Sequence, residues 1–249
     1  MFELKIDDAK SFKDSVDAIA TLIDESEFDI NQDGMFLRAM DPSQIAMVDF
    51  KLPKSSFETF NVPEQTKIGL NLDDLARIMS RVRPGENLTL KLDDTASRLE
   101  LVFKGKTTRK FNLPLLDIGN TSPKTPSIEF DAKIKLNGNV IKEGLKDASL
   151  VSSHVILKAT EKGFDITAHG DKGDVVIEAL KEQDILLEHT VNAEAKAMFP
   201  LEYLNDLLKS ADASSIVEIN LGTDKPLKLQ YEVGAATLTY FLAPRIETD

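Results

Sequence analysis

A short amphipathic stretch that occurs twice decides the fold: LDDLARIM at residues 72–79 and LEYLNDLL at residues 201–208. The apolar residues of the first copy, such as Leu72 and Leu75, have apolar counterparts in the second, here Leu201 and Leu204, at a constant offset of 129. A recurring offset between similar segments is the signature of a repeated structural unit.

The same offset relates further segments, and these follow one another in the same order. The matched pairs are 12–19 with 141–148, 34–39 with 163–168, and 88–92 with 217–221. The strand expected at 2–6 matches 130–134 at an offset of 128, so that Phe2 corresponds to Phe130. Five similar elements in one order indicate two copies of one fold, and two unrelated α+β domains are the alternative.

Both copies have patterns typical of strands and helices that bury one face. Apolar residues alternate in segments such as 2–6, 88–92 and 99–103, which is typical of antiparallel sheets with one buried face. Helices with a single apolar stripe are expected at 11–23, 72–82, 140–151 and 201–211. We therefore predict an α+β fold of two tandem domains, with the helices on one face of antiparallel sheets.

Composition predicts where the two domains meet. Residues 113–127 contain three prolines and several small polar residues, a composition typical of a linker. We predict an N-terminal domain at 1–112, an interdomain connecting linker at 113–127 and a C-terminal domain at 128–249.

The bulk charge argues against a nucleic-acid partner, because 42 acidic residues outnumber 30 basic ones and give a net charge of −12. The absence of cysteine excludes disulfides, thiolate catalysis and cysteine zinc sites. No apolar run is long enough to span a membrane, and we see no secretory signal at the N-terminus. A cytoplasmic protein fits these features best.

Motifs for catalysis or metal binding are weak. Residues 29–34 imitate the start of an EF-hand loop, but Met40 occupies the position that needs a glutamate. His154, His169 and His189 lack the spacing of metal ligands, and no phosphate-binding glycine motif occurs. We expect no catalytic residue, metal ion or cofactor, and an uncharacterised hydrolase is the enzymatic alternative.

Basic side chains occupy the free faces of the predicted helices. Lys142 and Lys146 lie one turn apart, and Arg77 and Arg81 repeat that spacing. Such residues can contact phosphates without reading bases, although the acidic residues nearby also fit an ordinary solvated face. No aromatic residue is interleaved with them, so stacking of single-stranded bases is not indicated.

Five short motifs of the chain match one known family: MFE at 1–3, MDPS at 40–43, GLNL at 69–72, KDA at 146–148 and LAPRIE at 242–247. On these motifs the chain resembles the proliferating cell nuclear antigen (PCNA) family, the sliding clamps of archaea and eukaryotes. The match covers the whole chain in order, and the short loops suggest an archaeal type. It implies a non-enzymatic DNA polymerase processivity factor, built from two sliding-clamp domains per chain, that encircles double-stranded DNA as a homotrimer.

The resemblance also implies roles for individual residues. Those implied to face DNA are Lys10, Lys13, Arg77, Arg81, Lys142, Lys146 and Lys209. The net acidity would then lie on the outer surface of the ring. Those implied to join neighbouring subunits, within segments 108–113 and 175–179, are Arg109, Lys110, Phe111, Val175, Val176 and Ile177.

A hydrophobic pocket for PIP-box peptides is the implied partner site. The implied clients are DNA polymerase, the clamp loader, a flap nuclease and DNA ligase, and the implied location is the cytoplasm at the nucleoid, or the nucleus for a eukaryotic source. The residues implied to form the pocket are Met40, Ile45, Met47, Leu116, Ile118, Pro226, Phe241, Ala243, Pro244 and Ile246. The chain departs from its relatives at 119–125, which is polar where they often carry larger apolar residues.

Two alternatives stay open from the sequence. One is a subunit of a heterotrimeric clamp, and the other is a bivalent β-rich scaffold with no role on DNA. Reversing the charge of Lys142 and Lys146 separates the scaffold from the clamps, because only a clamp would then lose processivity.

Overall fold

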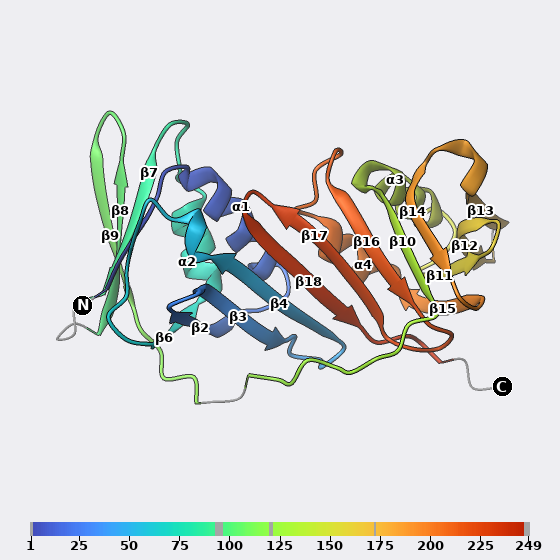
Figure 1. The fold of residues 1–249 in the computed structure, drawn as a ribbon, viewed down its shortest axis with the longest axis horizontal. Helices are drawn as coiled ribbons and strands as arrows, with labels where there is room; N and C mark the ends of the chain where they lie inside the picture. Colours follow the sequence, from blue (N-terminus) through green and yellow to red (C-terminus); the bar gives the residue numbers. More distant parts are fainter. Residues whose placement is uncertain (1, 93–96, 120–121, 172, 247–249) are drawn as a thin grey trace. The chain divides into compact units, whose positions relative to one another are not determined.

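The computed structural model describes residues 2–92, 97–119, 122–171 and 173–246. Its contacts divide the chain into two compact units. The first comprises residues up to 42, 48–123 and 233–238, and the second comprises 43–47, 124–232 and residues from 239. Each unit has two helices and antiparallel strands, as the α+β prediction requires (Figure 1).

The first half of the chain forms two sheets and two helices. Its elements are β1 (Phe2–Ile6), α1 (Ala9–Ala20), β2 (Glu25–Asn31), β3 (Gly34–Met40), β4 (Ala46–Pro53), a 3₁₀ turn (Lys54–Ser56), β5 (Thr59–Asn61), β6 (Thr66–Asn71), α2 (Leu72–Met79), β7 (Asn87–Leu92), β8 (Arg98–Lys104) and β9 (Thr108–Pro114). One sheet has the order β5-β1-β7-β8-β9, and the other contains β4-β3-β2-β6. Strand β9 therefore lies at a sheet edge.

The second half repeats this arrangement. Its elements are β10 (Ala132–Asn137), α3 (Gly138–Ala148), β11 (His154–Thr160), β12 (Gly163–Gly170), β13 (Gly173–Leu180), a 3₁₀ turn (Lys181–Gln183), β14 (Leu186–Val191), β15 (Ala195–Pro200), α4 (Leu201–Leu208), β16 (Ile216–Leu221), β17 (Leu227–Val233) and β18 (Ala236–Leu242). One sheet contains β14-β10-β16-β17-β18, and the other has the order β13-β12-β11-β15. Strand β13 is an edge strand.

The helices bury the predicted stripe, and α2 shows how such a helix begins. Asn71 precedes α2, and its side-chain oxygen accepts a hydrogen bond from the N–H of Asp74, which satisfies a donor that the helix leaves without a partner. Leu72, Leu75 and Met79 are then buried against the sheet. The same division between a buried stripe and a free face holds for the other three helices.

Each helix ends three residues before its predicted end. The sequence predicts ends at 23, 82, 151 and 211, and the observed ends are 20, 79, 148 and 208. After α2 the N–H groups of Arg81 and Val82 donate to carbonyls three residues back, so the chain continues as a tighter turn of the 3₁₀ type. The apolar period continues through this turn, because apolar residues such as Ala211 stay buried.

The register of the N-terminal strand corrects one detail of the repeat. In β1, Phe2 pairs with Leu92 of β7, and in β10 Ala132 pairs with Leu221 of β16. Leu92 and Leu221 are equivalent at the offset of 129, so Phe2 corresponds to Ala132, and its assignment to Phe130 was wrong. Alternation has a period of two, so it cannot distinguish registers that differ by two residues.

Two glycines keep the repeated hairpins close to the next strand. A Cβ at Gly34 would lie 2.2 Å from the carbonyl oxygen of Leu52, and one at Gly163 would lie 2.3 Å from that of Ala179. Any side chain at these sites would overlap the neighbouring backbone. The two glycines are equivalent positions of the repeat, so the steric constraint is repeated with the fold.

The predicted linker begins as ordered structure of the first unit. Strand β9 extends to Pro114, and the N–H of Leu115 donates to the carbonyl oxygen of Ser97 at 2.9 Å. Strand β10 begins only at Ala132. In the described part of the chain, no helix is long and apolar enough to cross a membrane.

Candidate DNA-facing and partner-binding surfaces

Most of the basic residues implied to face DNA already have acidic partners on their own helix. On α1 the Nζ atoms of Lys10 and Lys13 lie 2.5 Å from carboxylate oxygens of Asp14 and Asp17, respectively. The hydrogen bond to Asp17 raises the pKa of Lys13 above its ordinary value. The charges of both lysines are largely compensated within the helix.

The same compensation recurs on α2 and α3. Arg77 lies 3.3 Å from Asp74, and Lys146 lies 2.6 Å from Glu143, each at an i,i+3 spacing. Pairs of this spacing on an exposed helix contribute only a few tenths of a kcal/mol, so a phosphate can compete for either cation.

Lys142 has a structural role that sequence reasoning missed. Its Nζ donates to the carbonyl oxygen of Ala211 at 2.8 Å and lies 3.5 Å from that of Lys209, just beyond the end of α4. Carbonyl groups at a helix C-terminus lack intrahelical partners and carry partial negative charge, so a lysine there stabilises the helix end. No local pattern around Lys142 indicates this contact, because its partners belong to a distant part of the chain.

Arg81 and Lys209 differ from the rest of the set. Both side chains are exposed, and within the described residues neither has an ion pair within 4 Å. Arg81 therefore carries uncompensated positive charge, whereas Lys209 is close enough to Asp206 to lower the pKa of that carboxyl.

The residues implied to form the partner pocket fall on both units. In the first unit Met40 is 38% exposed, and the N–H of Leu116 donates to the carbonyl oxygen of Gly69 at 2.9 Å. A Cβ at Gly69 would lie 3.0 Å from Ile118, so the linker residues Leu116 and Ile118 cover this glycine.

In the second unit the C-terminal segment connects several of the remaining pocket residues. The N–H of Ala243 donates to the carbonyl oxygen of Ile45 at 2.9 Å. Met47 and Phe241 are buried, and Ile246 is 67% exposed. Pro226 and Pro244 are half-buried.

The residues implied to join subunits lie on the two edge strands, but Arg109 points to a different role. Its guanidinium lies 2.5 Å from the buried carboxylate of Glu86 and over the ring of Phe103, 5.1 Å from its centroid. Lys110 pairs with Glu100 at 3.2 Å. Arg109 is thus committed to its own unit, and nothing in the sequence around it indicates Glu86 as its partner.

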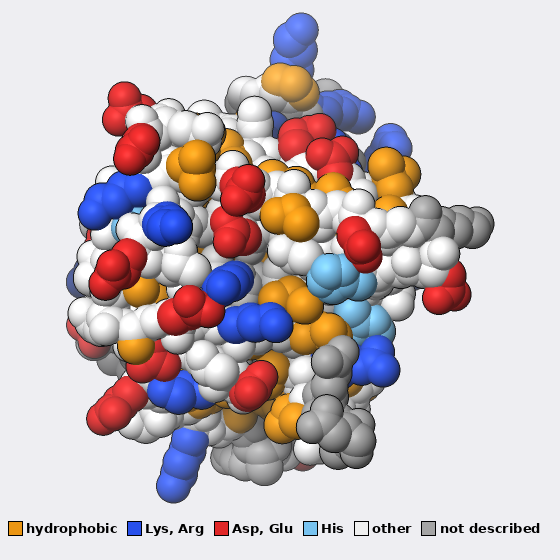
Figure 2. Space-filling model, turned by 90° about the vertical axis from the view of Figure 1, so that its right-hand side faces the viewer, with side chains coloured by type: hydrophobic (Ala, Val, Ile, Leu, Met, Phe, Trp, Pro, Cys, Tyr) orange, Lys and Arg blue, Asp and Glu red, His pale blue; other side chains and the backbone are white. Residues whose placement is uncertain are grey.

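Apolar side chains on both edge strands are left partly open. Phe111 on β9 is half-buried and packs edge-on against Phe103, with ring centroids 5.7 Å apart. On β13, Val175 and Ile177 are half-buried, whereas Val176 is 57% exposed. Acidic, basic and apolar side chains are intermixed on the face of the molecule toward which β13 lies (Figure 2).

The three histidines have no common site. Nδ1 of His169 lies 2.8 Å from Asp174, and Nε2 of His189 lies 2.8 Å from the carbonyl oxygen of Thr160. Nε2 of His154 lies 3.0 Å from Nη1 of Arg245. Among the described residues, no group of three or more histidine and carboxylate side chains could hold a metal ion.

Comparison with known proteins identifies the family. Residues 1–122 match the N-terminal domain model of proliferating cell nuclear antigen, and residues 124–246 match its C-terminal domain model. The DNA polymerase sliding clamp 1 of Thermococcus kodakarensis is 37% identical over 99% of both chains. The DNA polymerase sliding clamp of Methanococcus vannielii is 37% identical over 96% of this chain and 97% of its own.

Solved structures agree with this assignment. The crystal structure of PCNA from Thermococcus kodakaraensis has a TM-score of 0.94 at 29% identity, over 98% of this chain and all of that one. A. fulgidus PCNA, solved with the C-terminal region of FEN-1 bound, has a TM-score of 0.92 at 30% identity over the whole of both chains. The predicted fold class and family are confirmed. The chain belongs to the proliferating cell nuclear antigen family of DNA sliding clamps, which are non-enzymatic processivity factors.

Proposed function

We propose that three copies of this chain close a ring around duplex DNA and tether replication and repair enzymes to it. The observation that carries the proposal is the pair of sheet-edge strands, β9 in the first half and β13 in the second. An exposed edge strand is a template for pairing with another chain. Pairing β9 of one copy with β13 of the next is a head-to-tail contact, which forms a ring when the rotation between copies closes.

Ring closure would bury the apolar side chains that a single chain leaves open. Phe111 and Ile177 are half-buried on their edge strands, and Val176 is one of six large hydrophobic residues in the described chain that are exposed. Lys110 lies on the same edge strand as Phe111, where its Nζ pairs with Glu100. Arg109 pairs with Glu86 of its own unit and so stabilises the edge strand β9. Its part in the interface is therefore indirect.

The free helix faces would hold DNA by many weak phosphate contacts. Arg81 supplies uncompensated charge, and a phosphate can compete with the acidic neighbours of Lys209 and of the ion-paired lysines and arginines. Contacts of this kind hold the duplex without fixing a register, so the ring can slide. The remaining acidity of the chain, with a net charge of −12, would keep DNA off its outer surface.

Client enzymes would bind through PIP-box peptides at the C-terminal segment. Ile246 of this segment is an exposed large hydrophobic, as a site that accepts apolar side chains requires. The relative from A. fulgidus was solved with the C-terminal region of FEN-1 bound. By similarity we propose a polymerase, a clamp loader, a flap nuclease and a ligase as clients, acting at the nucleoid in the cytoplasm.

Light scattering on a sizing column, across a dilution series, tests ring formation. We expect a mass near three times the 27.6 kDa of one chain. Replacing Ile177 with Asp should shift the mass to that of one chain, because a charge at a paired edge is costly. A wild-type mass of one chain at every concentration would contradict the homotrimer and point to a heterotrimer with other subunits.

A further inference from the structure

We infer that opposite charges on the two edge strands select which strands pair: Lys110 of one copy binds the carboxylates of Asp174 and Glu178 of the next. The inference rests on the proposed ring, because it concerns the contact that closes the ring. It adds the reason why β9 pairs with β13 of another copy and not with a second β9.

Strand β13 has one apolar face and one acidic face. Its pairing with β12 places Ile177 directly opposite the buried Ile166. A Cβ at Gly144 of α3 would lie 3.8 Å from Ile177, so the helix lies against the apolar face. Successive residues of a strand point to opposite faces, so Asp174 and Glu178 lie on the face turned away from the helix.

Strand β9 has the same two-sided arrangement with the opposite charge. Arg109 and Phe111 lie on the helix side, because Arg109 reaches Glu86 in the turn between α2 and β7. Lys110 lies on the other face, where its Nζ is 3.2 Å from the carboxylate of Glu100. The Lys110 side chain is 60% exposed, so this pair is weak and another carboxylate can compete for the lysine.

A sheet that continues from β9 of one copy into β13 of the next keeps the residues of each face side by side. On the helix side Phe111 then packs with Ile177. On the other side, Lys110 lies either directly across from one acid or diagonal to both, because Asp174 and Glu178 are only four residues apart. Diagonal neighbours are about 7–8 Å apart, which a long side chain can span, so the ion pair does not depend on a single register.

Pairing of like with like brings equal charges together. Two antiparallel β9 strands place one Lys110 near the other, and two β13 strands place Asp174 near Glu178. Like charges on facing strands are destabilising, so both arrangements are disfavoured. Either arrangement would also give a two-fold dimer, whereas a head-to-tail contact leaves an edge free for the next copy. The charges therefore favour the contact that a ring needs.

The acidic face of β13 contains a repulsion that a further cation would reduce. Glu178 lies directly opposite Asp165 on β12, and among the described residues it has no ion pair within 4 Å. Burial, and then Glu178, raise the pKa of Asp165, while Lys158 on the far side of β12 lowers it. A lysine from the next copy would approach Glu178 from its open side.

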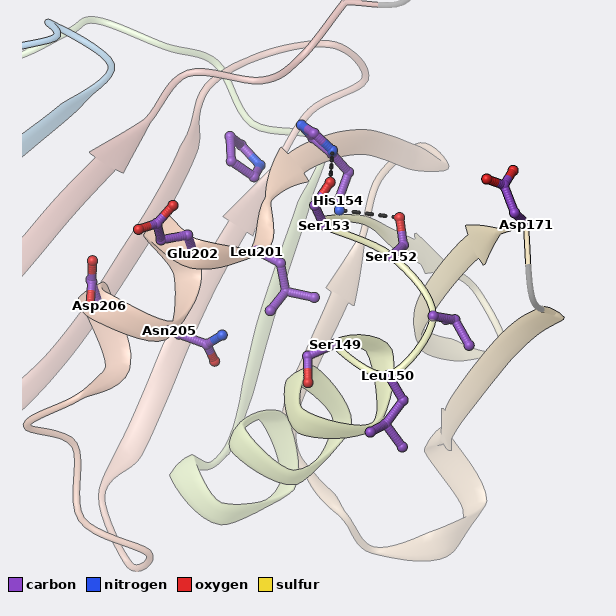
Figure 3. A pocket seen from close by; sticks show the side chains of 12 residues that line it. Ser149, Leu150, Ser152, Ser153, His154, Asp171, Leu201, Glu202, Asn205 and Asp206 are labelled. Carbon is purple, nitrogen blue, oxygen red and sulfur yellow. Dashed lines mark hydrogen bonds between the residues drawn. The ribbon is translucent and has the colours of Figure 1, made fainter.

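These acids are separate from those of α4. Asp171, Glu202 and Asp206 are among the residues that line a cavity of about 880 Å³ at the start of α4. Figure 3 shows Asp171, in the turn before β13, well apart from Glu202 and Asp206. Asp174 and Glu178 follow on the face of β13 that is turned away from α3, so they lie outside the helix faces implied to contact DNA.

Exchange of charges tests the inference on the full-length chain, by light scattering on a sizing column across a dilution series at low salt. Lys110→Glu should raise the dissociation constant of each contact roughly tenfold, because an attraction becomes a repulsion. Adding Asp174→Lys and Glu178→Lys to this variant restores opposite charges and should recover the mass of the trimer. Lys91→Glu is the matched control, because Lys91 pairs with Glu3 on interior strands of the same sheet, and it should leave the mass unchanged.

A Lys110→Glu chain that dissociates like wild type, or a triple variant that does not recover the trimer, would overturn the inference. At about 1 M salt the Debye length falls to about 3 Å, so the difference between Lys110→Glu and wild type should shrink. A difference that persists at high salt would also reject a role of charge. A wild-type mass of two chains at every concentration would show like-with-like pairing and reject the selection. A wild-type mass of one chain contradicts the proposed ring itself, whereas a wild-type trimer with charge-insensitive variants rejects only the inference.

Discussion

The backbone N–H of Leu116 donates to the carbonyl oxygen of Gly69, and a Cβ at Gly69 would lie 2.2 Å from the carbonyl oxygen of Leu116. The second half repeats this interaction at the equivalent positions of the repeat, where the N–H of Arg245 donates to the carbonyl oxygen of Met198 at 2.8 Å. In each half, the segment that follows the last strand thus pairs with a strand at a sheet edge. Only the first half has a glycine there.

Replacing Gly69 with Ala should displace the linker from β6. The new methyl group overlaps backbone that cannot turn away as a flexible side chain can, so we expect a loss of about 1–3 kcal/mol in the free energy of unfolding. Urea denaturation measures it, and weaker binding of a PIP-box peptide should accompany it. Lys67→Ala on the same strand is the control and should retain peptide binding. Unchanged stability in the Gly69 variant would show that the linker is not held by this hydrogen bond.

The buried pair of Glu86 and Arg109 should be essential to the stability of the first unit. Glu86 also accepts a hydrogen bond from the N–H of Arg83 at 2.9 Å, so its carboxylate is held from two sides. Arg109→Met leaves this carboxylate buried without its cation, and we expect a loss of about 3–5 kcal/mol in urea denaturation. Adding Glu86→Gln to that variant should restore part of the stability. A single variant as stable as wild type would contradict the pairing.

Arg81 and Lys13 should differ in their effect on DNA. Removing an uncompensated cation lowers the slope of log affinity against log salt by about 0.9 for each phosphate that the cation had neutralised. We expect this for Arg81→Ala and a smaller change for Lys13→Ala, because Asp17 already compensates Lys13. The apparent affinity for linear duplex, measured across a salt series, gives both slopes. Equal slopes for the two variants would mean that ion pairing on α1 does not limit DNA binding.

The pair of His154 and Arg245 predicts a stability change in mild acid. Burial and Arg245 lower the pKa of His154 in the folded chain, so the unfolded chain binds the proton more readily. Stability should therefore fall as the pH drops below the unfolded value of about 6.5, and level off below the folded pKa. The urea midpoint, compared between about pH 7.5 and pH 5, should fall more in wild type than in His154→Gln. Equal falls in both proteins would assign the acid sensitivity to other groups.

The sequence was sufficient to predict the architecture, because local periodicities indicate the helices, the strands and their repetition. The stripe of Leu72, Leu75 and Met79 and its copy on α4 predicted the helices, alternation predicted the strands, and their constant offset revealed two tandem domains. The same patterns placed the cations on the free helix faces. The family motifs added the ring and the partner pocket, neither of which follows from periodicity.

Tertiary structure decided how these side chains are used. It showed that the repeat equivalent of Phe2 is Ala132 and not Phe130, that Lys142 contacts the end of α4, and that Arg109 pairs with Glu86 inside its own unit. It also brought Leu150, Glu202 and Asp206 to one cavity. An apolar period of two residues in a strand, or of 3.6 residues in a helix, indicates which face of that element is apolar. Strand register, ion pairs and cavities depend on residues distant in sequence that only folding brings together, and their energies are set by that packing.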